Sequence, residues 1–285
     1  MEGARRLIVN CDDFGSTLGA NAAVERCLEA GLATSASLML PCPWAWDAVL
    51  RSRAHPAWQV GVHLTLTAEW SRYRWGPLLP RDRVPGLCDP DGFLWARPAD
   101  VHAHASAEEA LLEGTAQVER ALSWGLRPSH LDSHMGASQT HPAFFDAYLA
   151  VAARFGLPVR MAGDPELAAG VRRGAPWAAE ARAMARARGV DFADDLLLPS
   201  RRSPAESEDD FLRRSLGALP PGITEVFFHP CEDGIETRAV MGASSAAARA
   251  GDLERLTARG AGSLRAAIEA EGIGLAHRDD VRRRP

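Results

Sequence analysis

Short apolar runs alternate with longer helical patterns along almost the whole chain, and this alternation restricts the fold more than any other feature. The apolar runs predict strands at residues 7–11, 33–40, 59–67, 129–135, 158–162, 191–198, 223–229 and 273–277. The helical patterns lie at residues 17–30, 44–53, 106–124, 142–155, 176–188, 207–219, 246–259 and 263–271. This alternation predicts an α/β fold, a barrel of seven to eight mostly parallel strands. No linker divides the sequence, so residues 1–285 are expected to form a single domain.

Residues 68–105 interrupt this alternation directly after the third predicted strand. The segment is rich in Trp, Pro, Arg and Gly and has no regular period. Loops of this length in a compact domain are usually functional or disordered, and the aromatic residues here argue against disorder. We therefore expect an ordered insertion that covers a site, with Trp70, Tyr73, Trp75 and Trp95 available to stack on a ligand. The alternative is that these rings only pack the insertion onto the barrel.

Charge and composition exclude several classes of function. The formal net charge is -5, so general binding to nucleic-acid phosphates is not expected. All 32 basic residues are arginines, which excludes a catalytic lysine and a Walker-type phosphate loop. The five cysteines are odd in number and lack C-x-x-C spacing, which argues against a disulfide framework or a zinc knuckle. Without a signal peptide or a long apolar span, we expect a cytoplasmic protein that does not contact membranes.

Ionisable side chains gather where the predicted strands end, which is where barrels of this class carry their catalytic groups. They are Asp12 and Asp13 after the first strand, His63 in the third, His130, Asp132 and His134 in the fourth, and His229 at the end of a late strand.

The fourth predicted strand carries three ionisable residues at every second position. A strand places His130, Asp132 and His134 on one face, and both faces of a parallel sheet are normally apolar. Three buried ionisable groups need partners or a metal ion. Two imidazoles and one carboxylate form a ligand set typical of catalytic zinc, although iron and manganese are also compatible. The alternatives are paired structural groups or the polar face of an antiparallel sheet.

The adjacent acids Asp12 and Asp13 are the second candidate cluster. A helix cap and a turn would account for one acid each, but neighbouring anions repel unless a cation or hydrogen bonds intervene. A divalent ion held by one carboxylate would leave the other free to act as a base. His63 is a weaker candidate, because a single histidine on a strand is often a structural group.

Four motifs in the same order resemble the YdjC-like carbohydrate deacetylases. They are Asn10-x-Asp12-Asp13-Phe14-Gly15, Gly61-x-His63-Leu64-x-Leu66-Thr67, Pro128-x-His130-Leu131-Asp132-Ser133-His134, and His229-Pro230. The resemblance covers the chain from the first strand to about Pro230.

The resemblance implies a distorted (β/α) barrel and a metal-dependent hydrolase that removes an acetyl group from an N-acetylated sugar. It implies one divalent ion, Zn²⁺ or Mg²⁺; the family is associated with magnesium, whereas imidazole ligands favour zinc. The implied roles are Asp13, His63 and His134 as metal ligands, Asp12 as the base for a metal-bound water, His229 as the acid for the leaving amine, and Arg160 as an arginine that helps to hold the site. Apart from the resemblance, Asp132 is a candidate acceptor for the second N–H of a metal-bound histidine, and His130 is expected to support the ligands or bind substrate.

The sequence departs from the family at one point and leaves three alternatives open. Members that act on chitooligosaccharides carry further histidines where this chain has Gly136 and Ser138, so the wall near the substrate is expected to be smaller and less basic. Another metal-dependent amidase or phosphoesterase, or a non-catalytic sugar-binding protein stabilised by metal, would also fit the residues. A homodimer is compatible with Trp44 and Trp46, which form either an interface patch or the start of a helix.

Overall fold

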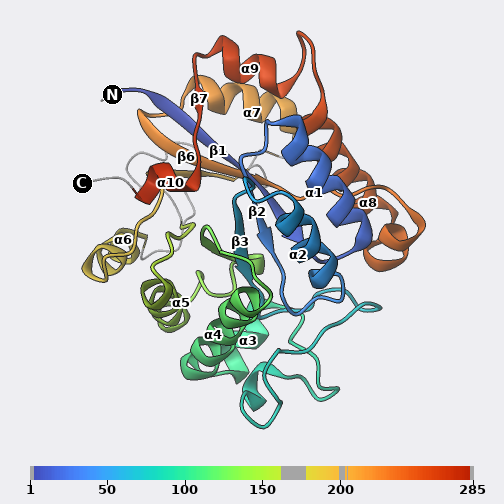
Figure 1. Cartoon of the computed structure of the whole chain (residues 1–285), viewed down its shortest axis with the longest axis vertical. Helices are drawn as coiled ribbons and strands as arrows, with labels where there is room; N and C mark the ends of the chain where they lie inside the picture. Colours follow the sequence, from blue (N-terminus) through green and yellow to red (C-terminus); the bar gives the residue numbers. More distant parts are fainter. Residues whose placement is uncertain (1–2, 162–177, 199–202, 204, 283–285) are drawn as a thin grey trace.

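A computed structural model describes residues 3–161, 178–198, 203 and 205–282. Its centre is a sheet in the order β4-β3-β2-β1-β6-β5, with β7 beside the start of β1 (Figure 1). The strands are β1 (Arg5–Phe14), β2 (Ser35–Leu38), β3 (Val60–Leu64), β4 (Leu131–Ser133), β5 (Asp195–Leu197), β6 (Gly222–Phe228) and β7 (Gly274–Leu275). Every pairing between these strands is parallel, which confirms the predicted α/β class.

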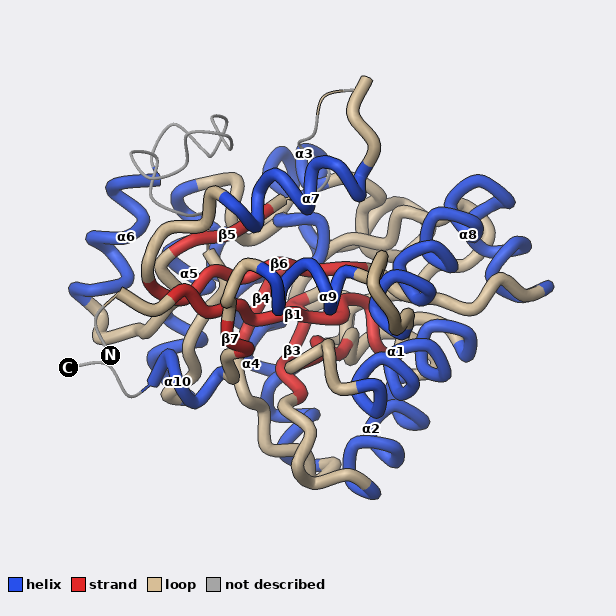
Figure 2. The backbone as a smooth tube through the Cα atoms, turned by 90° about the horizontal axis from the view of Figure 1, so that it is seen from above, coloured by secondary structure: helices blue, strands red, loops and turns tan. Residues whose placement is uncertain are grey.

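The sheet curls into a half-barrel that helices surround (Figures 1 and 2). Helix α1 packs on α2 and α8, and helix α5 packs on α4 and α6. The helices are α1 (Leu18–Ala30), α2 (Ala45–Ala54), α3 (Pro98–His104), α4 (Ala107–Ser123), α5 (Pro142–Phe155), α6 (Ala178–Ala187), α7 (Glu208–Gly217), α8 (Ile235–Thr257), α9 (Leu264–Ala270) and α10 (Arg278–Arg282). Short 3₁₀ turns form at Pro85–Leu87 and His134–Gly136.

Capping residues fix several helix ends where the sequence predicts them. Thr17 accepts a hydrogen bond from the backbone of α1, and Gly31 ends that helix in the left-handed conformation, with φ 73°. Ser106 and Glu109 form the predicted capping box at the start of α4. Most other predicted strands and helices agree with the observed ones to within a few residues.

The strand predicted at residues 158–162 is wrong. Within its described part, only Val159 makes sheet pairings, as a bridge to Leu131 on one side and to Phe192 on the other. Pro158 has no N–H group to donate, which limits a regular ladder here. Residue 162 lies outside the described residues. Through these two bridges, Val159 connects β4 to the segment that precedes β5.

The strand predicted at residues 129–135 is shorter than expected. β4 ends at Ser133, and His134 begins a 3₁₀ turn. Met135 and Gly136 both have positive φ, 51° and 66°, which an extended strand cannot accommodate. The argument that placed His134 on the same strand face as His130 and Asp132 therefore fails, although the side chain still reaches the site.

Three helices were missed in whole or in part. α3 lies inside residues 68–105, where no regular structure was expected, and α10 was not predicted. α8 starts at Ile235 rather than at residue 246 and is broken at Gly242, where φ is 81°. Its first half is mostly exposed and so lacks the apolar stripe from which a helix is predicted.

The segment 68–105 is ordered by contacts with the barrel. Trp75 is buried, and its Nε1 donates a hydrogen bond to the backbone oxygen of Thr67 at 2.9 Å. The backbone N–H groups of Leu78 and Leu79 donate to the carboxylate of Glu113 on α4 at 2.9 and 3.1 Å. Trp75 therefore has the packing role that the sequence left open.

A buried ion pair attaches the C-terminal helix to the sheet. Arg278 of α10 donates to both carboxylate oxygens of Glu225 on β6, at 2.6 and 2.7 Å, and to Asn10 Oδ1 at 3.1 Å. Both members of the pair are at most 2% exposed. An isolated charge at either position would be strongly unfavourable, so each side chain depends on the other.

We expect Arg278→Met to lower the free energy of unfolding by about 3 kcal/mol, because it leaves Glu225 buried with one cation fewer. Urea titration followed by circular dichroism measures the change. Arg282→Met is the matched control on α10, since Arg282 is exposed and binds only a backbone oxygen. Equal stability of the two variants would show that the buried pair contributes little.

Candidate functional site

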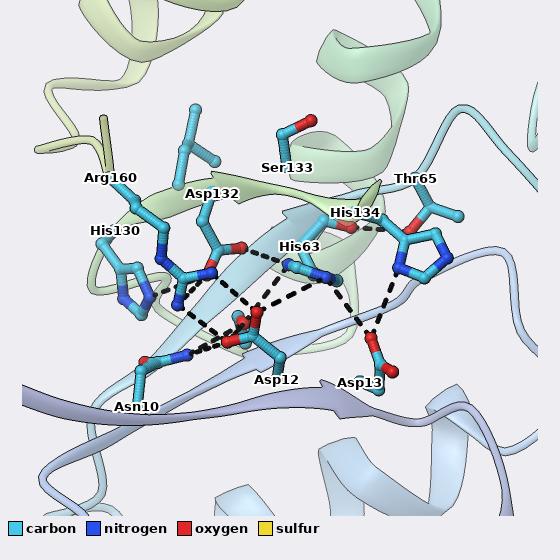
Figure 3. Close-up of polar contacts among 12 residues, drawn as sticks. Asn10, Asp12, Asp13, His63, Thr65, His130, Asp132, Ser133, His134 and Arg160 are labelled. Carbon is cyan, nitrogen blue, oxygen red and sulfur yellow. Dashed lines mark hydrogen bonds and ion pairs between the residues drawn. The ribbon is translucent and has the colours of Figure 1, made fainter. Parts of the chain in front are cut away.

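The carboxyl ends of β1, β3 and β4 bring the predicted site residues together (Figure 3). Asp12 and Asp13 lie at the end of β1, His63 lies near the end of β3, and His134 follows β4 directly. The neighbouring strands are paired in parallel, so their carboxyl ends meet at one edge of the sheet.

A bulge in β1 turns both acids toward the site. The register of β1 on β2 is irregular between Cys11 and Phe14, and Asp13 has φ 66°. On a regular strand, adjacent side chains point to opposite faces. Here Asp13 Oδ1 lies 3.4 Å and Asp12 Oδ2 lies 4.0 Å from the same atom, Nε2 of His63. Asp is one of the few residue types that adopt the left-handed conformation readily.

Asp13, His63 and His134 have the geometry of a candidate metal site. His63 Nε2 lies 3.4 Å and His134 Nδ1 lies 3.3 Å from Asp13 Oδ1, and the three ligand atoms lie within 4.8 Å of one another. Both carboxylate oxygens of Asp13 are buried without a hydrogen-bond donor. A buried carboxylate that faces two imidazoles fits a divalent cation. The residues therefore fit the ion that the sequence predicts.

The other nitrogen of each candidate ligand histidine contacts a carboxylate. His63 Nδ1 lies 2.5 Å from Asp132 Oδ1, and His134 Nε2 lies 2.9 Å from Glu69 Oε2. Such carboxylates orient metal-binding imidazoles and increase their basicity. Asp132 was expected to serve as such a partner. Glu69 was missed, and its only signal in the sequence is its place just after the third predicted strand.

These carboxylates control the charge of the site when no ion is bound. Burial lowers the pKa of His63 and of His134, but the nearby carboxylates outweigh it and raise the pKa to about 10 and about 9. Burial acts to raise the pKa of Asp13, yet Arg249 and the two histidines hold it well below its usual range. The apo site is therefore an anionic carboxylate between protonated imidazoles.

Arg160 joins the acids beneath the site. Its Nη1 and Nη2 donate to the two oxygens of Asp12, each at 2.7 Å, and Nη2 lies 3.0 Å from Asp132 Oδ2. Its Nε donates to Glu225 Oε1 at 2.6 Å, and its guanidinium lies over the ring of Phe227 at 4.4 Å. These contacts fix the orientation of Asp12 next to the candidate metal site.

The structure separates His130 from the metal group. His130 is fully buried, with Nδ1 2.8 Å from Ser129 Oγ and Nε2 3.7 Å from Asp132 Oδ2. Burial and the charge of Arg278 lower its pKa to about 4, so the ring is neutral. Gly61 is required beside it, because a Cβ at that position would lie 2.4 Å from His130 Nδ1.

His229 and Arg249 approach from the other side. His229 follows β6, its Nε2 lies 4.0 Å from Asp12 Oδ2, and its desolvated surroundings lower its pKa. Arg249 of α8 places Nη1 2.7 Å from Asp13 Oδ2. Arg249 was not predicted as a site residue, because nothing in the sequence distinguishes it from the other arginines in a chain with 32 basic residues.

Two further groups among the described residues have metal-compatible spacing, and one of them, Asp12, His63 and Asp132, shares His63 with the first group. Glu25, Glu29 and His55 lie together on the surface, outside the strand-end site. His55 is stacked on Trp58, and Glu25 is paired with Arg51. Exposed acidic groups are common without a metal ion, so the surface group of Glu25, Glu29 and His55 is used below only as a control site for metal binding.

Comparisons with known proteins agree with these residues. The sequence profile of the YdjC-like protein family matches residues 6–266. A carbohydrate deacetylase of Thermoanaerobacter pseudethanolicus is 30% identical over 224 residues, which cover 79% of this chain and 80% of that protein. A carbohydrate deacetylase of Enterococcus faecalis is 32% identical over 159 residues, 55% of this chain. That match spans 59% of the Enterococcus protein, less than two thirds of its length.

A solved structure has the same fold over almost the whole chain. It is a protein of Enterococcus faecalis described as a cellobiose-phosphate cleavage protein, 25% identical, with a TM-score of 0.82. The match covers 97% of this chain and 98% of that one. Among the described residues of the present chain, no helix has the length and apolar character needed to cross a bilayer.

We expect the wild-type protein to bind one equivalent of Zn²⁺ tightly and Asp13→Asn to lose that binding. Asparagine keeps the size and tolerates the left-handed backbone but removes the anionic ligand. Titration against a chromophoric chelator measures the affinity. Glu29→Gln, in the surface group, is the control and should bind as the wild type does. Loss of the tight equivalent in Glu29→Gln instead would place the ion at the surface group.

Ion affinity should also rise with pH. The pKa values of about 10 and about 9 mean that both imidazoles carry a proton near neutral pH in the apo protein, and each must lose it to bind. Two released protons strengthen the apparent affinity up to about 100-fold for each pH unit. The same titration at two pH values one unit apart tests this, and a pH-independent affinity would contradict it.

Proposed function

Because the chain belongs to the YdjC-like protein family, we propose that it is a metal-dependent hydrolase that removes the acetyl group from an N-acetylated sugar or oligosaccharide. The observation that carries the proposal is the buried group of Asp13, His63 and His134, with the further acid Asp12 beside it. The names of the two carbohydrate deacetylases above support the same reaction class.

In this proposal, Asp13, His63 and His134 hold one divalent ion, Zn²⁺ or Mg²⁺. When bound, such an ion lowers the pKa of a water molecule and polarises the acetyl carbonyl. The two imidazoles favour Zn²⁺ over Mg²⁺, because magnesium prefers oxygen ligands. Asp132 and Glu69 keep each imidazole oriented with one nitrogen directed at Asp13.

Asp12 is proposed as the general base. Its carboxylate lies on the same side of β1 as Asp13 and is held by Arg160 and by Asn10, whose Nδ2 donates to Oδ1 at 2.8 Å. A base that is fixed in this way takes the proton of the attacking water without first having to reorient. Asp132, Arg160 and His130 are proposed to act behind this layer, on the orientation of Asp12 and His63.

His229 is proposed to give a proton to the leaving nitrogen. The lowered pKa leaves its imidazole mainly neutral before the reaction, so it must first gain a proton. Its Nε2 lies 4.0 Å from Asp12 Oδ2, close enough for the proton taken by Asp12 to reach it through a bridging group. An amide nitrogen leaves poorly without a proton, so this transfer is essential to breaking the C–N bond.

The partner of the site is proposed to be a small N-acetylated sugar, with no nucleic acid or membrane involved. A different metal-dependent amidase, a phosphoesterase and a silent sugar-binding protein are the competing functions. Measurement of metal-dependent acetate release from a panel of N-acetyl sugars separates them. Release from at least one sugar supports the proposal, and release from none, by protein that holds its ion, would overturn it.

We also propose that the protein forms a homodimer through the surface around Trp44 and Trp46. Trp44 stands at the start of α2, where its Nε1 donates to Glu236 Oε1 at 2.8 Å. Trp46 is exposed and contacts Trp124 edge to face. Sedimentation of the wild type and of Trp46→Ala measures whether this surface joins two copies.

Asp12→Asn should keep the ion but lower kcat by about 10²–10⁴-fold, because it removes the base. The fold should persist at lower stability, because Arg160 keeps its pairs with Glu225 and Asp132. Asp13→Asn should lose activity through loss of the ion and recover part of it at high Zn²⁺ concentration. Kinetics at several Zn²⁺ concentrations separate the two cases. If both variants lost the ion equally, the roles of the two acids would be assigned wrongly.

His229→Ala should lower turnover of an N-acetyl sugar by about 10²-fold or more, because the amine then leaves without a proton donor. An activated acetyl ester, whose leaving group needs no proton, should be affected much less. The two substrates are compared under the same conditions, with His277→Ala as the control at an exposed position. Equal losses on both substrates would assign His229 to binding or to structure.

A further inference from the structure

His229 and Arg249 lie next to the candidate metal group and are more exposed than its ligands. The ligand side chains of Asp13, His63 and His134 are at most 5% exposed. Around them, the exposed fraction rises to 38% for His229 and 16% for Arg249. These two side chains, like Glu69 at 20%, therefore lie nearer the solvent than the ligands do.

Arg249 reaches Asp13 from the side opposite to the histidines. Both imidazoles face Oδ1 of Asp13, whereas Arg249 Nη1 lies next to Oδ2. The 2.7 Å contact is an ion pair between the buried Nη1 and one carboxylate oxygen, Oδ2. Nη1 carries two N–H groups, and its contact with Oδ2 can use only one of them, so the other is available as a donor beside the candidate metal site.

A guanidinium at this place weakens ion binding by itself. Like charges a few ångströms apart repel, and a guanidinium stays charged at all relevant pH values. Asp13 carries the opposite charge and would offset part of this repulsion when an ion is bound. The remaining repulsion between the guanidinium and a bound ion would be reduced by a second anion close to both. Amide hydrolysis forms such an anion at the acetyl oxygen.

We propose that Arg249 is a catalytic residue that donates a hydrogen bond from Nη1 to the acetyl oxygen as it becomes anionic, and afterwards to the acetate product. The inference rests on the proposed function and adds a donor to it.

Hydrolysis of the acetyl amide by this route requires proton transfers and one bond exchange at the carbonyl carbon. The water oxygen bonds to the carbonyl carbon, one water proton goes to Asp12, and the C=O π pair becomes a lone pair on the acetyl oxygen beside Arg249. That pair re-forms the C=O bond as the C–N bond breaks, and the nitrogen leaves with the bonding pair and a proton from His229. His229 receives that proton from Asp12, which returns both side chains to their starting state. Acetic acid then gives its proton to the amine through solvent, so the products are acetate and a protonated amine.

Trp70 holds the guanidinium in place. The guanidinium carbon of Arg249 lies 5.7 Å from the centre of the Trp70 ring, within cation–π range. Trp70 in turn packs edge to face on the buried Trp75. Lysine cannot reproduce both the stacking and the planar set of donors, so Arg249→Lys should behave as a loss of function that preserves the charge.

Acetate binding tests the proposal without turnover. The Zn²⁺-loaded wild type and Arg249→Met are titrated with acetate by calorimetry, with Arg238→Met as the control, since Arg238 is an exposed arginine of the same helix paired with Asp233. We expect acetate affinity to fall at least about 10-fold in Arg249→Met and to stay unchanged in Arg238→Met. Zn²⁺ affinity should be equal to or higher than that of the wild type, because a repelling cation has been removed.

Kinetics give the second measurement. Arg249→Met and Arg249→Lys should lower kcat on an N-acetyl sugar by about 10²–10³-fold with little change in KM, as expected for a donor that acts in the transition state. Added guanidinium ion should restore part of the activity of an Arg249→Ala variant and none of that of Asp12→Asn.

The outcomes separate this inference from the proposed function. Weaker acetate binding in Arg249→Met supports the role of Arg249 even if no sugar in the panel is deacetylated. Unchanged acetate binding, or no acetate binding by the loaded wild type, would overturn it. Weaker Zn²⁺ binding with unchanged kcat at saturating Zn²⁺ would also overturn it, since Arg249 would then only position Asp13.

Discussion

The buried guanidinium of Arg160 is the interaction on which the rest of the site depends. It binds Asp12 from β1 and Glu225 from β6 and lies beside Asp132 from β4, three carboxylates that would otherwise repel one another in the interior. Arg160 follows Val159, whose isolated bridges to Leu131 and Phe192 replace a regular ladder between β4 and β5. Removing one member of such a network leaves uncompensated buried charges. The fold and the chemistry of this region therefore cannot be separated.

The charges around the network explain why a divalent ion fits where it does. Arg160 and Arg278 satisfy the deeper carboxylates, so their oxygens have donors. Asp13 instead faces the two imidazoles and Arg249, and neither of its oxygens has a well-aligned hydrogen bond. Two imidazoles that share one of these oxygens hold protons in the apo state, and one divalent ion can replace both protons without a change in total charge. The deep part of the network is thus structural, and the outer part is free to exchange cations.

The sequence predicts the parallel sheet and most of the site because both depend on local patterns. Alternating strands and helices indicate the sheet, and polar residues at strand ends indicate its reactive edge. The bulge that turns Asp12 and Asp13 to one side depends on a left-handed Asp13, which no pattern indicates. Glu69 and Arg249 lie far along the chain from the residues they contact. Long-range contacts of this kind arise from packing, and a single sequence does not reveal them.

The segment 68–105 completes the site rather than merely covering it. Its first residues provide Glu69, which orients His134, and Trp70, which stacks against Arg249. Its buried Trp75 anchors these residues to the end of β3 through the backbone of Thr67. The strands thus supply the groups proposed to hold the ion, while the segment and α8 supply those that tune the ion and face the substrate. In barrels of this class, substrate preference varies through such segments while the strand-end chemistry stays the same. Selection of the proposed sugar substrate should therefore depend on residues near Trp70 and Arg249, rather than on the groups proposed to hold the ion.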